Sequence, residues 1–309
     1  MFNLGIIGAG SIAESHLTVI DKIKSLKVYG ITSKTNSKCK KLRKKFKIHK
    51  IFLNYIEMIK DKNINAVVLL VPPHEVIEVC KNIAKYKKPI FIEKPIGINF
   101  KETLQIKNLF NKNNVLNMVG FNRRFYSVFH KAIDIINKNG GLQNVIIEGH
   151  ERIWNLKKLK INKNYINNWH YLNSIHTVDL IRFFIGEIKN IEVIEKNKKK
   201  KIYISIINSV KKIKCIYFSN WNTSDGWSIK LYANKITIVF KPLENAYWFD
   251  ETLKINKIKP DLFDKKFKPG FYNQMIYFKK LLISKKNIWP SQSVQQSLQS
   301  SELIYKIFG

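Results

Sequence analysis

Short apolar runs alternate with helix-period segments along the first part of the chain, as far as Gly120. The predicted strands are 2–8, 27–32, 65–71, 89–93 and 115–119, and the predicted helices between them are 11–25, 36–46, 74–86 and 99–113. In the first of these helices the apolar positions recur at the spacing of about three to four residues that marks one helix face. Strands that alternate with helices predict a parallel sheet covered on both faces, which is an α/β Rossmann architecture.

The pattern changes after Gly120. A helix-period stretch (124–139) leads through Gly140-Gly141 to a strand (142–152), a polar stretch (157–168) and an apolar segment (171–185). Several strand-like runs then follow one another from 188 to 240, and helix-period stretches at 270–284 and 292–308 close the chain. Consecutive strands predict a mostly antiparallel open sheet. We therefore expect a dinucleotide-binding Rossmann domain (1–120) and an α+β domain for substrate binding and oligomerisation (121–309).

Composition narrows the class of protein without deciding its function. The chain has 309 residues and a formal net charge of +33, from 55 Lys and Arg against 22 Asp and Glu. This charge alone would favour a nucleic-acid or anionic partner. The basic residues are spread over every segment, however, whereas a binding footprint should be local. We therefore favour a generally Lys-rich composition and expect no nucleic-acid partner.

The chain shows neither a secretory signal nor an apolar run long enough to span a membrane. Cys39, Cys80 and Cys215 are far apart and have no metal-like spacing. Free thiols in a reducing compartment are the natural interpretation. We therefore expect a cytoplasmic protein with no membrane partner and no bound metal.

The motif Gly8-Ala9-Gly10-Ser11-Ile12-Ala13 directly follows the first predicted strand and opens the first helix. In this context Gly8 permits a tight turn, Gly10 lets the backbone approach a pyrophosphate, and Ala13 allows close helix–strand packing. The helix N-terminus attracts the anion. We therefore predict a dinucleotide site that includes Ser11 and Ile12.

The second predicted strand ends at Ser33-Lys34, without the acid that would bind the ribose 2′-hydroxyl of NAD. A hydroxyl beside a cation suits a 2′-phosphate better, which favours NADP(H) over NAD(H); Lys34 is also simply one of many lysines. Val71-Pro72-Pro73-His74 and Glu93-Lys94-Pro95 end two further strands at the same edge of the sheet. Lys94 is a candidate proton donor or acceptor there, with an ordinary Lys–Glu surface pair as the alternative.

Together these motifs resemble the Gfo/Idh/MocA family, named after glucose–fructose oxidoreductase, inositol dehydrogenase and a rhizopine-catabolism protein. The segments that carry the resemblance are 8–13, 71–74, 93–95, 120–125, 173–179, 226–232 and 268–272. They span essentially the whole chain, and their order and spacing are more specific than any single motif.

The resemblance implies an enzyme that transfers hydride between a nicotinamide and a hydroxyl or carbonyl carbon of a sugar, cyclitol or nucleotide sugar. It also implies a homo-oligomer formed through the open sheet. Lys94 matches the family lysine that hydrogen-bonds the reacting oxygen, and His176 matches its active-site histidine. Without the resemblance, His176 would be a core histidine on an apolar helix.

Four other side chains are candidates for substrate binding: Asn122, Arg123, Trp169 and Asn173. Arg123 or its neighbour Arg124 suits an anionic substrate group or, equally, an ion pair that joins the domains. Trp169 suits stacking on a sugar face, or burial in the core.

One position departs from the family pattern, because Leu172 stands where many members carry an Asp four residues before the histidine. This departure leaves a non-catalytic cofactor-binding or regulatory protein as the alternative to an enzyme. A basic nucleic-acid or anion binder is a more distant alternative.

Overall fold

The computed structural model describes residues 1–158, 161 and 163–309, and it comprises two compact units. Unit 1 consists of Met1–Asn122 and Lys266–Leu298, and unit 2 of Arg123–Lys265 and Gln299–Gly309. The sequence-based division into 1–120 and 121–309 differs from these units, because 266–298 group with unit 1. Of the predicted polar stretch 157–168, residues 159, 160 and 162 lie outside the described residues.

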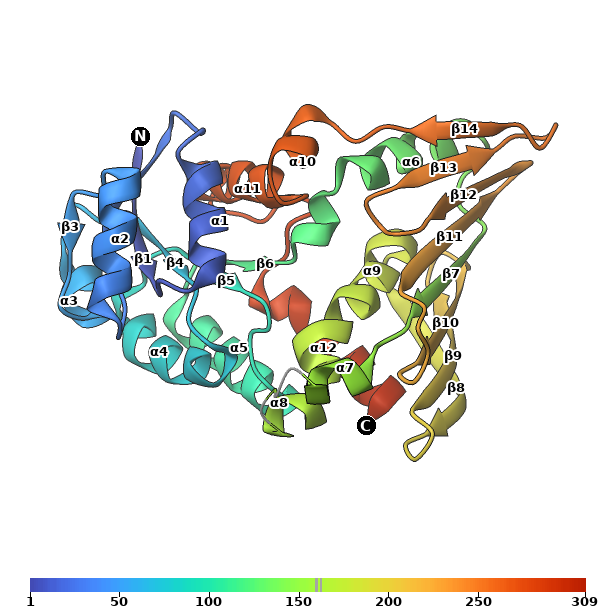
Figure 1. The fold of residues 1–309 in the computed structure, drawn as a ribbon, viewed down its shortest axis with the longest axis horizontal. Helices are drawn as coiled ribbons and strands as arrows, with labels where there is room; N and C mark the ends of the chain where they lie inside the picture. The colour runs from blue at the N-terminus through green and yellow to red at the C-terminus, as the bar shows by residue number, and fades with distance from the viewer. Residues whose placement is uncertain (159–160, 162) are drawn as a thin grey trace. The chain divides into compact units, whose positions relative to one another are not determined.

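Unit 1 is built on a six-stranded parallel sheet in the order β3-β2-β1-β4-β5-β6 (Figure 1). Its strands are β1 (Phe2–Ile7), β2 (Leu26–Thr32), β3 (Lys50–Ile51), β4 (Ala66–Leu69), β5 (Ile90–Glu93) and β6 (Asn117–Gly120). Every residue of β4 is buried, as expected for a central strand with helices on both faces. The predicted Rossmann sheet is confirmed.

The helices of unit 1 follow the predicted order. They are α1 (Ser11–Ile20), α2 (Asn36–Phe46), α3 (Tyr55–Lys60), η1 (Pro73–Glu75), α4 (Val76–Ile83), η2 (Ala84–Tyr86), α5 (Phe100–Asn113) and α11 (Phe271–Ser284). Sequence periodicity missed β3 and α3, which have only 2 and 6 residues and so are too short for a repeating pattern to be recognised. It also extended the first helix to 25, whereas α1 ends at Ile20 and the chain turns before β2.

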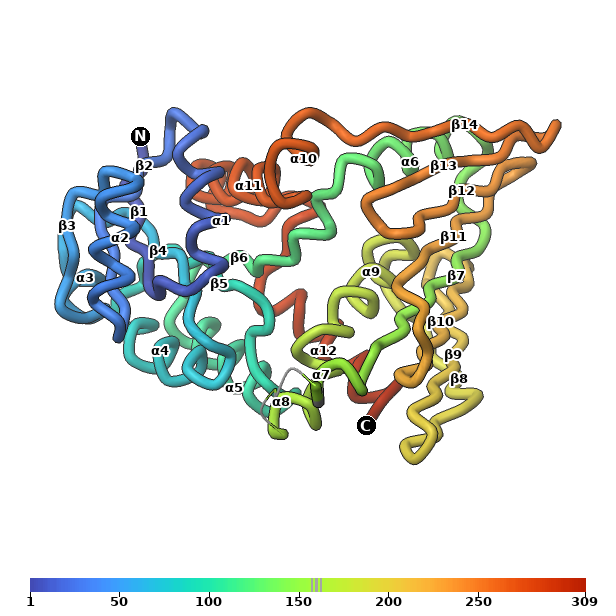
Figure 2. The backbone as a smooth tube through the Cα atoms, viewed as in Figure 1, coloured from blue at the N-terminus to red at the C-terminus, as the bar shows by residue number. Residues whose placement is uncertain are grey.

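The chain returns to unit 1 near its end. Figure 2 traces this return: α11, although far away in sequence, lies beside α1. Phe271 contacts the His16 ring of α1 at 4.7 Å between centroids, and Phe278 contacts Phe91 of β5 at 5.6 Å. The stripe of Phe271, Met275 and Phe278 is fully buried. An apolar helix stripe does not identify the surface that it will cover, which is why the sequence left this helix in the second domain.

Unit 2 is built on an eight-stranded sheet in the order β14-β13-β12-β11-β7-β10-β9-β8 (Figure 1). Its strands are β7 (Asn144–Gly149), β8 (Ile188–Asn197), β9 (Ile202–Ser209), β10 (Lys214–Asn220), β11 (Trp227–Ala233), β12 (Ile236–Phe240), β13 (Ala246–Phe249) and β14 (Ile255–Ile258). Among the strands that the structure describes in this sheet, only β7 and β10 pair in parallel. The prediction of a mostly antiparallel sheet in an α+β unit is confirmed.

One face of this sheet is covered by helices. Both α9 (Ile175–Ile185) and α6 (Ser127–Lys138) contact its strands. The other helices in the second half of the chain, apart from α11, are η3 (Asn122–Phe125), α7 (Ile153–Lys158), α8 (Lys163–Asn167), a π-helical turn η4 (His170–Ser174), α10 (Leu262–Lys266) and α12 (Val294–Phe308). Strict alternation of buried and half-buried residues along β9 marks its two faces. Among the described residues, no helix is long and apolar enough to cross a membrane.

A buried ion pair fixes α9 to the start of unit 2. The Arg124 guanidinium donates to the Asp179 carboxylate at 2.6 and 3.0 Å, and the Ser300 hydroxyl donates to the same carboxylate at 2.8 Å. Both charged side chains are almost fully buried. A bidentate, additionally hydrogen-bonded carboxylate of this kind holds a specific geometry. Arg124 and Asp179 therefore have a structural role within unit 2.

Candidate functional site

The glycine-rich turn lies where β1 passes into α1. Gly8 has a φ of +111°, and a Cβ built on it would lie 2.5 Å from the Leu70 carbonyl oxygen. Its N–H donates to the Thr32 carbonyl oxygen at 2.8 Å, which ties the turn to the end of β2. Only glycine fits this position, since a side chain would meet both the unfavourable φ and the neighbouring backbone.

The N-terminus of α1 is suited to an anion. Gly10 is its N-cap and offers no side-chain hydrogen bond, so the first N–H groups of the helix are not capped by it. No described atom lies within 4 Å of a Cβ built on Gly10, and both Gly10 and Ser11 are exposed. Ala13 is fully buried against the sheet. A pyrophosphate fits this arrangement of open backbone donors at the positive end of a helix.

The ends of β2 and β4 lie at the same edge of the sheet. Lys34 forms an ion pair with Glu75 at 3.0 Å, and Glu75 also lies 3.6 Å from the His74 imidazole. The short helix η1 carries His74 and Glu75; it begins at Pro73, and Pro72 precedes it. Sequence analysis did not single out Glu75. The predicted cofactor residues of these two strands are therefore brought together, with a carboxylate added beside them.

Glu93 and Lys94, at the end of β5, complete this edge. The Glu93 carboxylate receives a hydrogen bond from His16 Nε2 at 2.8 Å, and its other oxygen accepts the Lys94 backbone N–H at 2.9 Å. His16 is fully buried on α1, with its ring against Phe91 and Phe271. No motif in the sequence singled out His16, which lies on the apolar face of the first helix. The pair anchors the backbone at Lys94 to the helix that begins at the glycine turn.

Asn122 has a backbone partner. Its side-chain amide donates to the Pro269 carbonyl oxygen at 3.0 Å, and the residue is buried. This bond links the end of the parallel sheet to the segment that leads into α11. The predicted role of Asn122 in substrate binding is untested by this contact, which occupies one of its amide donors.

Unit 2 gathers the other predicted substrate residues into one cluster. The Arg123 guanidinium lies 4.5 Å from the Trp227 ring, and the His176 ring lies 6.1 Å from the same indole between centroids. His176 is buried on the first turn of α9. Trp169, which directly precedes the π-helical turn η4, and Asn173, which lies on it, are both half-buried. Leu172 is buried, so its side chain contributes to the core.

Glu151, which the sequence did not reveal, joins this cluster. Its carboxylate accepts hydrogen bonds from Trp169 Nε1 at 2.9 Å, from Asn173 Nδ2 at 3.0 Å and from the Ser174 hydroxyl at 2.8 Å. Burial raises the pKa of Glu151, while these hydrogen bonds and the Arg123 charge oppose the shift. The available sequence signal was an acid two residues beyond the end of β7, three residues after Glu148.

A second polar group in unit 2 contains potential metal ligands. Among the described residues, Glu148, His150 and Asp225 have ligand atoms within 4.8 Å of one another. The His150 Nδ1 atom accepts the Asn220 backbone N–H at 3.1 Å, so the ring proton of a neutral imidazole is on Nε2. Asp225 is paired with Lys241 at 2.7 Å. The imidazole thus presents no lone pair to an ion, and we assign no metal to this group.

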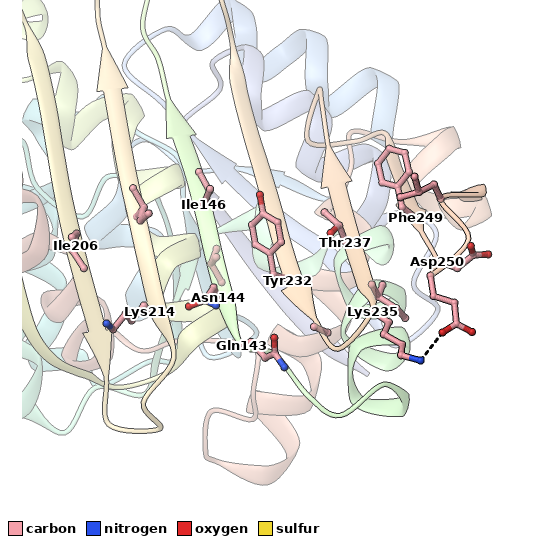
Figure 3. A pocket seen from close by; sticks show the side chains of 16 residues that line it. Gln143, Asn144, Ile146, Ile206, Lys214, Tyr232, Lys235, Thr237, Phe249 and Asp250 are labelled. Atoms are coloured by element: carbon pink, nitrogen blue, oxygen red, sulfur yellow. Dashed lines mark hydrogen bonds and ion pairs between the residues drawn. The ribbon is translucent and has the colours of Figure 1, made fainter.

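The uncovered face of the unit 2 sheet carries a broad hollow of about 1010 Å³ (Figure 3). Figure 3 shows Ile206, Ile146 and Tyr232 side by side on this face, and Ile216 belongs to the same lining. Ile216 is 42% exposed. Of the residues predicted for catalysis, cofactor or substrate binding, none lines the part of the hollow that the structure describes. This apolar surface is therefore separate from the cluster around Glu151.

Comparison with known proteins connects the glycine turn to a family. Residues 2–121 match the Gfo/Idh/MocA model, described as an oxidoreductase family with an NAD-binding Rossmann fold. The chain is 35% identical over 136 residues to YrbE, an uncharacterised oxidoreductase of Bacillus subtilis. It is 28% identical over 189 residues to a myo-inositol 2-dehydrogenase of Thermotoga maritima. These alignments cover 44% and 60% of this chain, but only 40% and 55% of the two relatives.

The whole chain has the fold of solved oxidoreductases. A levoglucosan dehydrogenase in complex with NADH matches with a TM-score of 0.80 at 14% identity, over 99% of this chain and 95% of that one. At this identity the match establishes the fold alone. It extends the likeness beyond residue 121 to the antiparallel unit.

We expect the same substitution to have different effects at the two glycines of the turn. Gly8→Ala should lower the melting temperature by about 2 °C or more, since alanine at positive φ is strained by about 1 kcal/mol or more. Gly10→Ala should leave the melting temperature unchanged and weaken NADH binding on the order of tenfold, because its methyl group would occupy the approach of the pyrophosphate. Thermal melting and fluorescence titration with NADH measure both. Unchanged NADH affinity in Gly10→Ala would contradict the assignment of the dinucleotide to this turn.

Proposed function

Because residues 2–121 match the model of the Gfo/Idh/MocA oxidoreductase family with its NAD-binding Rossmann fold, we propose that the chain is an NAD(P)-dependent dehydrogenase or reductase of this family. Its proposed substrate is a sugar, cyclitol or nucleotide sugar that reacts at a hydroxyl or carbonyl carbon. The observation that carries this proposal is the glycine turn with an open helix N-terminus, at the sheet edge that also holds Glu93 and Lys94. The myo-inositol 2-dehydrogenase and levoglucosan dehydrogenase named above support the substrate class.

The proposed roles of the side chains follow from their chemistry. A bound nicotinamide supplies the hydride donor or acceptor. Lys94 is proposed to hydrogen-bond the reacting oxygen, with its backbone held by the His16–Glu93 pair. His176 is proposed to exchange the proton of the hydroxyl, since an imidazole nitrogen can either donate or accept a proton. Arg123, Trp169 and Asn173 are proposed to bind the substrate.

We propose NADP(H) as the preferred cofactor. Ser33 and Lys34 offer a hydroxyl and a cation, which suit a 2′-phosphate, at the end of β2. Lys34 is bound to Glu75 by an ion pair in which the lysine is 81% exposed. Such a surface pair contributes only about 0–1 kcal/mol, so a phosphate with two negative charges can displace Glu75 from Lys34.

We also propose that the protein forms a homo-oligomer through the open face of the unit 2 sheet. The hollow on this face presents Ile146, Ile206 and Ile216 to solvent, and apolar surfaces of this kind are typical of interfaces between copies of a chain. A cytoplasmic location is part of the same proposal. It is supported by three cysteines that are all buried and free of disulfides.

Replacement of Lys94 tests the catalytic proposal. Lys94→Ala should lower turnover of a polyol substrate by about 100-fold or more, because a proton-transfer group is lost. Its affinity for the cofactor should stay within a few-fold, and Lys101→Ala, an exposed lysine of α5, should behave as wild type. Steady-state kinetics and cofactor titration measure both effects. Cofactor binding without turnover by the wild-type protein on any polyol or ketosugar would favour the non-catalytic alternative.

Titration with NADPH and NADH, followed by energy transfer from tryptophan, tests the cofactor preference. We expect tighter binding of NADPH, and Ser33→Asp should shift the affinity ratio towards NADH on the order of tenfold by repelling the 2′-phosphate. Lys62→Gln is the control, since this exposed lysine precedes β4 at the opposite edge of the sheet. If the ratio of the NADPH and NADH affinities is unchanged in Ser33→Asp, the 2′-phosphate does not bind at this strand end.

Light scattering tests the oligomer. The wild-type mass should be a multiple of the 36.3 kDa chain, and Ile216→Asp should reduce it by placing a charge in the interface. Ile283→Asp, which changes an exposed isoleucine of α11 in unit 1, should leave the mass unchanged. A monomeric wild-type protein would contradict this proposal.

A further inference from the structure

The buried carboxylate of Glu151 organises two side chains that are partly open to solvent. Glu151 and Ser174 are almost fully buried, whereas Trp169 and Asn173 are half-buried. All three partners of the carboxylate come from one short segment, the turn η4 and the residue before it. Within this segment the helix is π-helical, a rare geometry that is frequently found at functional sites. The carboxylate therefore fixes the segment that leads directly to His176.

These hydrogen bonds dictate which atoms remain for a ligand. An ionised carboxylate only accepts hydrogen bonds, so Asn173 must turn its NH₂ group towards Glu151. The same bond leaves Asn173 Oδ1, an acceptor, as the amide atom that is directed away from the carboxylate. The Trp169 N–H is likewise used by Glu151, which leaves the face of the indole for apolar contact. The pair thus offers one acceptor and one aromatic face.

This combination selects a class of ligand. A hydroxyl group donates to a carbonyl-type oxygen, and the C–H face of a sugar or cyclitol ring stacks on an indole. A carboxylate or phosphate would instead meet the Asn173 oxygen and the negative charge of Glu151. The Arg123 charge lies near enough to Glu151 to oppose the rise that burial causes in the Glu151 pKa. The positive charge of Arg123 is therefore partly balanced within unit 2. The surface therefore favours an uncharged ring.

We propose that Glu151 is a positioning residue of the substrate site, which orients Trp169 and Asn173 to bind a neutral polyhydroxylated ring. Asn173 Oδ1 accepts a hydrogen bond from one ring hydroxyl, and Trp169 stacks on the ring. This inference rests on the proposed function. It supplies, from two residues beyond the end of β7, a carboxylate that is bonded to the turn before the helix of His176, where Leu172 provides none.

The first readout needs no turnover. Full-length protein labelled with ¹⁵N and saturated with NADH gives an indole N–H signal for Trp169, assigned by its loss in Trp169→Phe. Myo-inositol and D-glucose, as neutral probes, should shift this signal saturably, whereas D-glucuronate should do so at least tenfold more weakly. Glu151→Gln should move the signal in the absence of any sugar, since the acceptor loses its charge.

The second readout separates positioning from folding. Glu151→Gln should raise KM for the neutral polyol that is turned over by about tenfold while kcat falls less than threefold. Glu148→Gln is the matched control: this carboxylate lies on β7, three residues before Glu151, accepts from the Ser228 hydroxyl and should leave both constants unchanged. If Glu151→Gln does not fold, Asn173→Leu, which keeps the side-chain shape and removes Oδ1, should give the same rise in KM.

The outcomes distinguish the two proposals. Failure of the wild-type protein to bind NADH or NADPH would overturn the proposed function and this inference with it. Cofactor binding with no response of the Trp169 signal to either neutral probe would overturn only the inference. So would an equal or stronger response to D-glucuronate, or an unchanged KM in both Glu151→Gln and Asn173→Leu.

Discussion

The dinucleotide-binding unit depends on a single close approach of two backbone segments. Gly8 lies so near the Leu70 carbonyl that a methyl group would stand 2.5 Å from its oxygen. This contact lets β1 and β4 lie side by side up to their carboxyl ends while the chain turns sharply into α1. The sheet edge and the helix N-terminus are therefore formed by the same turn. The other residues of this edge are placed relative to it.

A hydrogen-bonded carboxylate performs a similar task in each unit, half-buried in the case of Glu93 and buried in the case of Glu151. Glu93 connects α1 to the backbone of Lys94, and Glu151 connects the end of β7 to the turn that precedes α9. Glu93 accepts one hydrogen bond from His16, which is distant in sequence, and one from the backbone N–H of its neighbour Lys94, whereas Glu151 accepts hydrogen bonds from Trp169, Asn173 and Ser174. Such hydrogen bonds offset the cost of removing a carboxylate from water. Each pins a segment with a candidate functional side chain, Lys94 or His176. The geometry of both sites thus rests on polar groups in the interior, behind the side chains proposed to act.

Local patterns were sufficient for most of the fold. The strand–helix alternation of 1–120 predicted the parallel sheet, and the consecutive strands of 188–240 predicted most of the antiparallel one. Short elements such as β3 were not predicted, because two residues are too few to show a periodic pattern. The affiliation of α11 also escaped, since its stripe of Phe271, Met275 and Phe278 specifies that a face is buried but leaves its partner open. The alternation in β9 marked the two faces of a strand without saying which one helices would cover.

The sequence by itself determined the residues whose chemistry is local. Gly8, Gly10 and Ala13 are legible because the turn, the open N-cap and the close packing are all made within one short segment. Lys94 and His176 were selected as candidates from motifs of neighbouring residues, and their roles remain proposals. Only the tertiary structure decided the roles of His16, Glu75 and Glu151, because each gains its meaning from a partner or partners outside its own segment. The sequence gives the chemical type of each side chain, but the long-range fold determines which groups lie within hydrogen-bonding distance of it.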